Sequence, residues 1–291
     1  IEMASNPIVQ KFFKYYSRHE SFLNQIKGRA MMIDSTVDEK GMFENLHPPK
    51  QTVSILNWKE EKRNYVFPTI FTDTRTTCLI YTANYQKVLA QVPKALPKPV
   101  RVSPSRCLMM FTLLQYGNVS DGMLGYNEFV IGTFLSLSRI PILPAVFRKQ
   151  FKSTVFYAFD MPVDSQENCT RGQRIWGLPK TMKNFEIQES ERSSGNPGHF
   201  YCKVENQGDL SYEMSAPVAG KRWFTKREST RSVSISEQGQ ANISDIFLQS
   251  DQQLYYTSRS PLANEVSLKV GNNSDCSWIN KIELSKTPLC V

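Results

Sequence analysis

A succession of strand-like segments in the middle of the chain constrains its fold most. Between Tyr65 and Pro217 the sequence is dominated by short apolar runs rich in β-branched and aromatic residues, a composition typical of strands. We expect strands at Thr77–Thr82, Cys107–Tyr116, Tyr126–Leu137, Thr154–Phe159, Lys183–Gln188, Phe200–Glu205 and Leu210–Ala216. Helices are few there: Asn84 should cap one over Tyr85–Gln91, and Ser165 one that runs towards Trp176. This order predicts an α+β fold dominated by antiparallel sheet.

The rest of the chain suggests one large domain with an N-terminal extension. The chain has 291 residues, 40% of them hydrophobic, so it can bury a substantial core. Asn6-Pro7 marks a helix start, followed by apolar residues at helical spacing. We therefore expect residues 1–64 to form a helical extension that packs on the core or on a neighbouring subunit, and residues 65–291 to form the main domain. Its last part, from Gly220, is expected to form strands with polar loops.

Several classes of protein are disfavoured. The longest apolar stretches, Cys107–Leu114 and Ile140–Phe147, are far shorter than the roughly 18–20 residues of a membrane helix. No Cys-x-x-Cys occurs and the three histidines are scattered, so we expect no metal and no cofactor. The net charge is +8, and the one concentrated basic run is Lys221–Arg227. A solvated strand or loop is the favoured interpretation of that run, and no nucleic-acid partner is expected. An anionic ligand or a lipid surface stays an alternative partner for it.

The cysteines and glycosylation sequons favour a secreted or extracellular protein. The six cysteines form an even set, and we expect a disulfide between Cys276 and Cys290, which bracket a terminal segment with little other anchoring. Four Asn-x-Ser/Thr sequons occur, at Asn118, Asn168, Asn242 and Asn272, and each is a candidate glycosylation site. The chain also begins at Ile1 rather than Met, as a processed chain would.

One lysine stands out for its chemistry. In Trp176-Gly177-Leu178-Pro179-Lys180 it follows a rigid turn among apolar residues, and Gly172-Gln173-Arg174 lies just before it. Upstream are Gly125-Tyr126-Asn127-Glu128, the segment Tyr65-Val66-Phe67-Pro68, and a helical segment from Asn84 that ends in Val92-Pro93. In this order and spacing, the motifs resemble the acetoacetate decarboxylase family over roughly Tyr65 to Pro217.

The resemblance implies a fold and a set of site residues. Members of the family form a closed, cone-like β-barrel around an apolar cavity, and many assemble into oligomers, so a homo-oligomer is expected. Lys180 would be the nucleophile that forms a Schiff base with a β-keto acid, and Glu128 would be the remaining acid. Residues lining the substrate would be Arg75, Phe111, Tyr126, Trp176 and Leu178. Arg75 matches the family's arginine only loosely, and Thr74 is the alternative at that position.

The imine chemistry sets a condition on Lys180. An amine attacks a ketone only when it is neutral, and lowering a lysine pKa from about 10.4 to about 7 means destabilising the ammonium by roughly 4–5 kcal/mol. The family usually supplies a second lysine next to the first, where this chain has Thr181, and a glutamate after the core aromatic, where it has Thr112. Burial by Trp176, Leu178 and Met182 would have to act instead. An exposed ammonium, or one paired with a carboxylate, would count against the imine.

Two functional interpretations follow. In the first, the protein is a Schiff-base-forming lyase, decarboxylase-like, acting on a β-keto acid or related carbonyl compound. In the second, it is a secreted carrier without catalysis that binds an apolar molecule such as a lipid, terpenoid or pigment in the former active-site cavity. Thr181 and Thr112 favour the carrier, whereas Lys180 and Glu128 favour the enzyme, which we place ahead. A plainer alternative places Lys180 in a solvated turn and Glu128 on a solvent-facing strand position.

Overall fold

A computed structural model describes residues 51–67, 69–120, 122–136, 154–190, 198–218, 224–235, 241–252 and 265–288. Most of the helical extension expected over residues 1–64, including the helix near Asn6, lies outside these residues, and its described part, from Gln51, forms strands instead of a helix. The described part begins with a hairpin of β1 (Gln51–Leu56) and β2 (Lys62–Phe67), which pair antiparallel. This hairpin supplies Tyr65 and Phe67 to the packing around α4 (Gln166–Trp176).

The largest element is a nine-stranded sheet with the order β14-β13-β8-β7-β6-β3, to which β4, β5 and β9 add at β7, β6 and β8. Its main strands are β3 (Phe71–Asn84), β6 (Arg106–Val119), β7 (Leu124–Ser136), β8 (Thr154–Val163), β13 (Phe224–Ile235) and β14 (Ala241–Gln252). The short ones are β4 (Lys98–Pro99), β5 (Arg101–Ser103) and β9 (Lys180–Met182). The pairs β8–β13 and β8–β9 are parallel and the others antiparallel.

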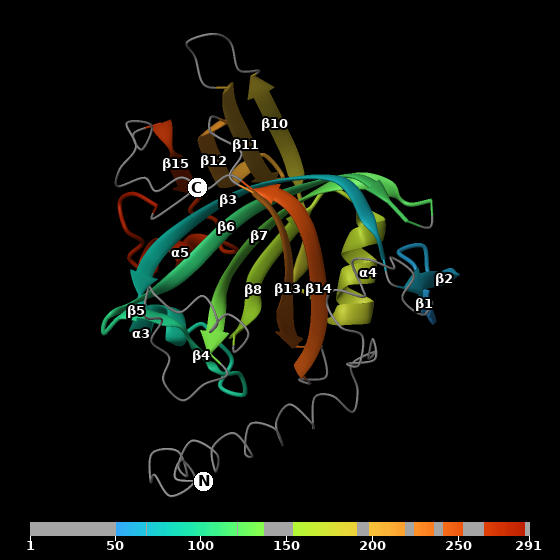
Figure 1. Cartoon of the computed structure of the whole chain (residues 1–291), viewed down its shortest axis with the longest axis horizontal. Helices are drawn as coiled ribbons and strands as arrows, with labels where there is room; N and C mark the ends of the chain where they lie inside the picture. The colour runs from blue at the N-terminus through green and yellow to red at the C-terminus, as the bar shows by residue number, and fades with distance from the viewer. Residues whose placement is uncertain are drawn as a thin grey trace, which may run out of the picture.

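A second, four-stranded sheet packs against this large one. It has the order β10-β11-β12-β15, formed by β10 (Asn184–Ser190), β11 (Gly198–Asn206), β12 (Asp209–Val218) and β15 (Ser267–Val270). Phe129 of β7 stacks on Tyr212 of β12, with ring centroids 5.2 Å apart. The short helix α5 (Ser277–Lys281) joins the same core through Ile279. Helix α4 and this small sheet lie on different sides of the long strands (Figure 1).

The predicted strands and helix caps are confirmed. Each expected strand between Tyr65 and Pro217 coincides with an observed one, although Lys183 precedes β10 instead of opening it. Asn84 caps α3 (Tyr85–Leu89) by accepting hydrogen bonds from the backbone of Gln86 and Lys87, and the Ser165 hydroxyl accepts one from the Asn168 amide. Capping side chains of this kind satisfy the amides that the first helical turn leaves open.

The large sheet is open along the part of the chain that the structure describes. Its path ends at β14, which pairs with β13, and at β3, which pairs with β6, and the two end strands do not pair with each other. The closed cone-like barrel that we expected is therefore not seen, while the α+β character with mainly antiparallel pairing is confirmed. No helix among the described residues is long and apolar enough to cross a membrane.

Candidate active site

The end of α4 places Lys180 on the sheet. Gly177 has φ +63°, and its amide donates to Gln173 O while the Leu178 amide donates to Gly172 O. These two bonds close the helix in the left-handed C-cap conformation that glycine adopts without a steric penalty. The chain then reverses through Pro179, whose carbonyl accepts a hydrogen bond from the Met161 amide. Lys180 consequently opens β9, opposite Met161 of β8.

Strand register brings Lys180 and Glu128 to one face. Glu128 is paired with Val163 and Lys180 with Met161, and side chains two residues apart on a strand share a face. Lys180 Nζ and Glu128 Oε2 form an ion pair, and both side chains are 5% exposed. The expectation that Lys180 is nearly excluded from water is confirmed, and the solvated turn is ruled out.

Aromatic side chains surround this ion pair. Lys180 Nζ lies 5.2 Å from the ring centroid of Tyr126, and the Tyr126 hydroxyl donates to Glu128 Oε2 over 3.5 Å. Tyr116 packs on Tyr126 with ring centroids 4.7 Å apart. Burial raises the pKa of both phenols well above 10, and the nearby Glu128 carboxylate raises it further. The two hydroxyls therefore stay protonated at neutral pH, which allows Tyr126 to donate to Glu128.

The ion pair between Lys180 and Glu128 differs from the neutral amine that imine formation requires. A carboxylate in contact with an ammonium stabilises the charged form, whereas nucleophilic attack needs the neutral amine. Lys180 thus meets the burial condition, while its partner Glu128 is the kind of group that counts against the imine. An imine-forming role for Lys180 would first require loss of a proton from its ammonium group.

Trp176 and Leu178 lie on the same side of the sheet as Lys180. Trp176 makes an edge contact with Phe67, with ring centroids 5.4 Å apart, and Leu178 packs against Val130 and Met161. Both side chains provide the apolar surroundings expected of them. Thr112, where the family carries a glutamate, also projects to this face, because it pairs with Val130.

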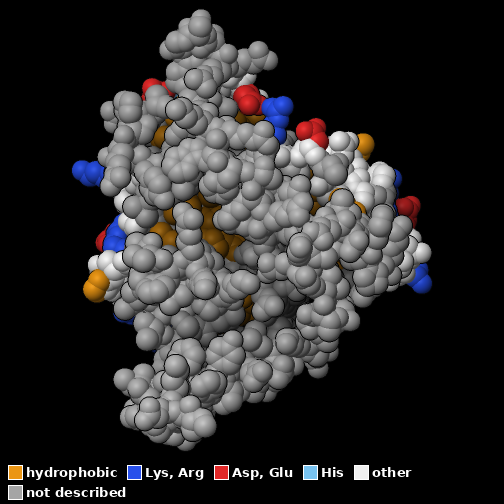
Figure 2. Space-filling model, viewed as in Figure 1, with side chains coloured by type: hydrophobic (Ala, Val, Ile, Leu, Met, Phe, Trp, Pro, Cys, Tyr) orange, Lys and Arg blue, Asp and Glu red, His pale blue; other side chains and the backbone are white. Residues whose placement is uncertain are grey.

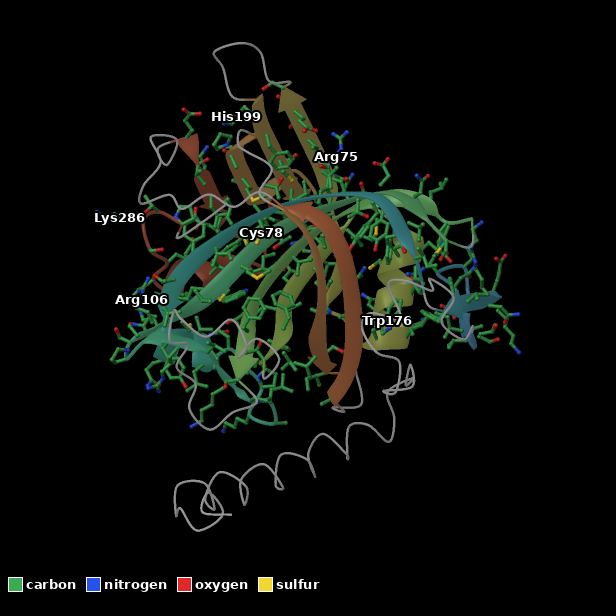
Figure 3. The ribbon with its side chains drawn as sticks, in the orientation of Figure 1. Arg75, Cys78, Arg106, Trp176, His199 and Lys286 are labelled. Carbon is green, nitrogen blue, oxygen red and sulfur yellow. The ribbon has the colours of Figure 1, made fainter. Side chains whose placement is uncertain are left out.

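Arg75 and Phe111 are not brought to Lys180. The Arg75 side chain is 67% exposed and pairs with Glu189 of β10 at 2.8 Å, and Figure 3 shows Arg75 far from Trp176. Phe111 is fully buried, but it pairs with Ile131 and packs edge-on against Tyr81 in the core under the small sheet. Because neighbouring residues of a strand face opposite ways, a one-residue offset separates Phe111 from the site.

Arg171, a buried cation of α4, was not predicted from the sequence. Its side chain is 2% exposed, its guanidinium carbon lies 5.1 Å from the Trp176 ring centroid, and one of its nitrogens contacts Met123 Sδ at 2.7 Å. Its positive charge partly offsets the raised pKa of Tyr116 and Tyr126. No pattern in the sequence marks Arg171, because the buried residues of α4, from Asn168 to Gly172, include polar side chains that hydropathy assigns to the surface.

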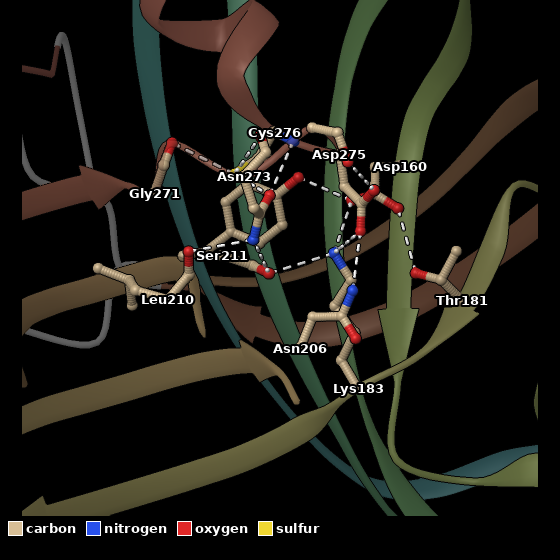
Figure 4. Close-up of polar contacts among 12 residues, drawn as sticks. Asp160, Thr181, Lys183, Asn206, Leu210, Ser211, Gly271, Asn273, Asp275 and Cys276 are labelled. Carbon is tan, nitrogen blue, oxygen red and sulfur yellow. Dashed lines mark hydrogen bonds and ion pairs between the residues drawn. The ribbon is translucent and has the colours of Figure 1, made fainter. Parts of the chain in front are cut away.

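A second buried lysine occupies the opposite face of the sheet (Figure 4). The Lys183 side chain is 1% exposed, with Nζ 3.7 Å from Asp160 Oδ2, 3.6 Å from Asp275 Oδ2 and 3.3 Å from Ser211 Oγ. Asp160 also accepts hydrogen bonds from the Tyr212 hydroxyl at 2.7 Å and the Thr181 hydroxyl at 3.3 Å. This Lys183 network connects β8, β9, β12 and the segment before α5, so we infer that its role is to stabilise the fold.

The cysteine and sequon predictions have mixed outcomes. The described cysteines, Cys276 among them, are free thiols, and Cys290 lies outside the described residues, so the expected disulfide is not seen. The Cys276 thiol instead donates to Asn273 Oδ1 at 2.8 Å. Asn118 and Asn272 are exposed, whereas Asn168 is 2% exposed at the start of α4 and is sterically closed to a glycan in the folded chain. The side chain of Asn242 is outside the described part.

The expectations about metals and basic surfaces are only partly covered by the structure. No group of three or more His, Cys, Asp or Glu side chains among the described residues could hold a metal ion. The residues Lys221–Trp223 and the side chains of Phe224–Arg227 lie outside the description, so the basic run stays a prediction. On the face shown in Figure 2, charged side chains of both signs are scattered around the margin, and apolar side chains are visible in a recess near the centre.

The match to a family model agrees with the motifs. The family model "Acetoacetate decarboxylase (ADC)" matches residues 59–232. Among solved structures, acetoacetate decarboxylase from Legionella pneumophila is similar, with 10% identity, coverage of 77% of this chain and 81% of that chain, and a TM-score of 0.48. An acetoacetate decarboxylase-like enzyme from Sphingomonas wittichii RW1 is similar, with 11% identity, 75% and 86% coverage, and a TM-score of 0.45. No curated protein sequence matched the chain. Because the family match spans more than half of its residues, the chain belongs to the acetoacetate decarboxylase family.

Proposed function

We propose that this protein is a Schiff-base-forming lyase that acts on a β-keto acid or a related carbonyl compound. Lys180 is the nucleophile, and Glu128 takes and returns its proton. The observation that carries the proposal is the contact between these two side chains, both buried, in a family that includes decarboxylases and related lyases.

Glu128 has a defined task in this proposal. Thr181 supplies no repulsive charge beside Lys180, so the neutral amine has to arise by proton transfer across the existing contact. Transfer turns an ammonium and a carboxylate into an amine and a carboxylic acid. Burial opposes charge on both groups, so desolvation lowers the cost of reaching the neutral pair. Tyr126 holds the carboxyl group in place through its hydroxyl.

Lys180 and Glu128 together supply the two protons that imine formation needs. The Lys180 nitrogen attacks the carbonyl carbon of the substrate. The carbonyl oxygen leaves as water with one proton from the nitrogen and one from the Glu128 carboxylic acid, which gives a protonated imine and restores the Glu128 carboxylate. Proximity of the acid to the nucleophile supplies the proton without a separate catalyst.

Decarboxylation follows from the charge on the imine. The carbon–carbon bond to the substrate carboxylate breaks, its electron pair moves to the imine nitrogen, and carbon dioxide leaves an enamine. A proton taken up from water goes to the enamine carbon, and a second water molecule hydrolyses the imine to a ketone and free Lys180. Trp176 and Leu178 provide apolar surroundings, in which a substrate that loses charge is favoured.

The test is product release from a panel of β-keto acids, beginning with acetoacetate. We expect the wild-type protein to release carbon dioxide, and Lys180→Met and Glu128→Gln to lower the rate by at least about a hundredfold. Arg75→Gln is the control, because Arg75 is exposed and distant from the site, and it should keep the wild-type rate. Absence of turnover across the panel by folded wild-type protein would overturn the lyase proposal.

The second candidate is a non-catalytic carrier of an apolar molecule. The ion pair favours it, since an ammonium held by a carboxylate is a poor nucleophile. Native mass spectrometry of protein purified from its source tests this candidate. A stoichiometric apolar ligand that remains bound to Lys180→Met would support the carrier, whereas ligand-free protein that turns over a keto acid would refute it.

A further inference from the structure

We propose that Gly172 is a positioning residue that directs the Lys180 side chain onto Glu128. For its catalytic readout this inference rests on the proposed lyase function, while its steric claim is independent of that function. Gly172 lies inside α4, an 11-residue helix, and is buried there.

The stem of Lys180 lies across the backbone of α4 at Gly172. A Cβ atom added at Gly172 would stand 2.4 Å from Lys180 Cδ, 2.8 Å from Cε and 3.1 Å from Cγ. Van der Waals repulsion excludes the two shorter distances, and the third is tighter than most contacts of a Cβ atom. Any side chain at position 172 therefore has to displace the Lys180 stem.

The backbone of Lys180 is held in place, so a Cβ atom at position 172 would have to move the Lys180 side chain. Gln173 Nε2 donates to Lys180 O at 2.6 Å, and the Leu178 amide donates to Gly172 O at 3.1 Å. On the other side, β9 is paired with β8. Helix and strand cannot separate without breaking these bonds. The amine at the tip of the stem, in contact with Glu128, would move instead.

Local backbone structure offers no other reason for a glycine here. Gly172 sits in the body of the helix, and its φ is not in the left-handed region, unlike that of Gly177. An interior glycine makes a helix less stable than alanine does. The packing of Lys180 accounts for the glycine, and it predicts that alanine at this position is harmful only while the lysine is present.

Stability measurements test the steric claim without any substrate. We expect Gly172→Ala to lower the melting temperature of the wild-type protein, and to raise it or leave it unchanged in the Lys180→Ala background, where the clashing atoms are gone. Gly132→Ala is the control, because its Cβ would meet Phe156 and Tyr157 instead of Lys180; it should destabilise both backgrounds equally. Equal effects of Gly172→Ala in the two backgrounds would overturn the inference.

Chemical trapping tests the positional claim. After reaction with acetoacetate and borohydride, we expect Gly172→Ala to show at least a tenfold lower yield of modified Lys180 than wild type, while Gly132→Ala keeps the wild-type yield per folded molecule. If wild type is itself not trapped, the proposed function fails and the stability comparison alone decides the inference. If wild type and Gly172→Ala are trapped equally, Gly172 does not position the amine.

Discussion

At the scale of single residues, Lys180 and Glu128 form an ion pair in which both side chains are buried. Removing one partner of such a pair leaves a buried charge uncompensated, and this typically costs about 3–5 kcal/mol. We expect Glu128→Gln to lower the free energy of unfolding by that amount, and Lys180→Met/Glu128→Gln to lower it by less than the sum of the single changes. Urea unfolding measures both.

The control for this prediction is the exposed pair Arg75–Glu189. Solvent screens exposed pairs, so Glu189→Gln should change the free energy of unfolding by about 1 kcal/mol or less. Equal effects of Glu128→Gln and Glu189→Gln would show that the Lys180–Glu128 contact is open to water in solution.

Buried thiols give a second prediction at this scale. Burial raises the pKa of Cys107 and of Cys202 to about 12, and the thiolate is the reactive form. We expect both cysteines to resist iodoacetamide in the native protein at pH 8 and to react after unfolding. Peptide mass spectrometry resolves the two sites. Rapid native labelling of Cys202 would contradict its position in the core.

Site residues were predictable where a motif fixed both residue type and register. The Gly-x-Pro-Lys turn identified Lys180, and Glu128 followed from its own motif. The prediction that Phe111 lines the site was wrong, because a motif match within a strand does not specify which face of the sheet the side chain is on. Phe111 pairs with Ile131, and this register places it on the face away from the site. Arg75 was matched loosely, and the positions around it on β3, from Asp73 to Thr76, are exposed.

At the scale of elements, the junction between α4 and β9 depends on Gly177. Its φ of +63° lies in a region where a side chain costs about 1 kcal/mol or more. We expect Gly177→Ala to lower the free energy of unfolding by roughly that amount and to reduce turnover, because the junction aims Lys180 at the sheet. Gly208→Ala is the control: Gly208 also has positive φ, at +90°, but lies in the turn between β11 and β12. It should cost stability without changing the rate per folded molecule.

The Lys183 network predicts a pH dependence of stability. Burial raises the pKa of Asp160 above 3.8, although Lys183 and the Tyr212 hydroxyl act in the opposite direction. Above 3.8 the folded chain holds a proton that the unfolded chain has lost, so this contribution is present at low pH and is lost as pH rises through the folded pKa. Asp160→Asn should be less stable overall and should flatten the part of the stability curve above pH 3.8. Urea unfolding against pH measures the slope, and the exposed Asp209→Asn should leave it unchanged.

Element type was predictable because β-branched and aromatic runs, capping residues and turn signals agreed with one another. Asn84 and Ser165 marked the two helix starts correctly. The start of β10 shifted by one residue because the Lys183 amide donates to Val163 O of β8, so Lys183 lies between β9 and β10, while its side chain is held by Asp160, Ser211 and Asp275. A network joined across such long sequence separations leaves no local signal.

At the scale of the whole molecule, the pattern of apolar residues along the strands predicts that both faces of the large sheet are covered. It does not predict whether the sheet closes into a barrel. The buried positions of β6 and β7 require cover on both faces, which the small sheet and α4 provide. Whether β14 meets β3 depends on strand tilt and stagger, which the sequence of each strand alone does not specify. The closed barrel was inferred from the family, and the described strands form an open sheet.

Secretion remains our proposal, and it gives a prediction for the whole chain. In protein purified from its source, we expect a glycan at exposed Asn118 or Asn272 and none at buried Asn168. Intact mass before and after deglycosylation, followed by peptide mapping, provides the measurement. A chain without any glycan, purified from the cytoplasm with every cysteine reduced, would contradict the proposal.

Borohydride trapping at Lys180 tests the central claim most directly, and Lys183 serves as an internal control. Both lysines are buried beside carboxylates and lie three positions apart, on opposite faces of the sheet. The protein is incubated with acetoacetate, reduced with borohydride, digested and analysed by mass spectrometry. We expect a covalent adduct on Lys180, none on Lys183, and none in Lys180→Met. An unmodified Lys180 in folded, substrate-saturated protein, or equal modification of both lysines, would contradict this expectation.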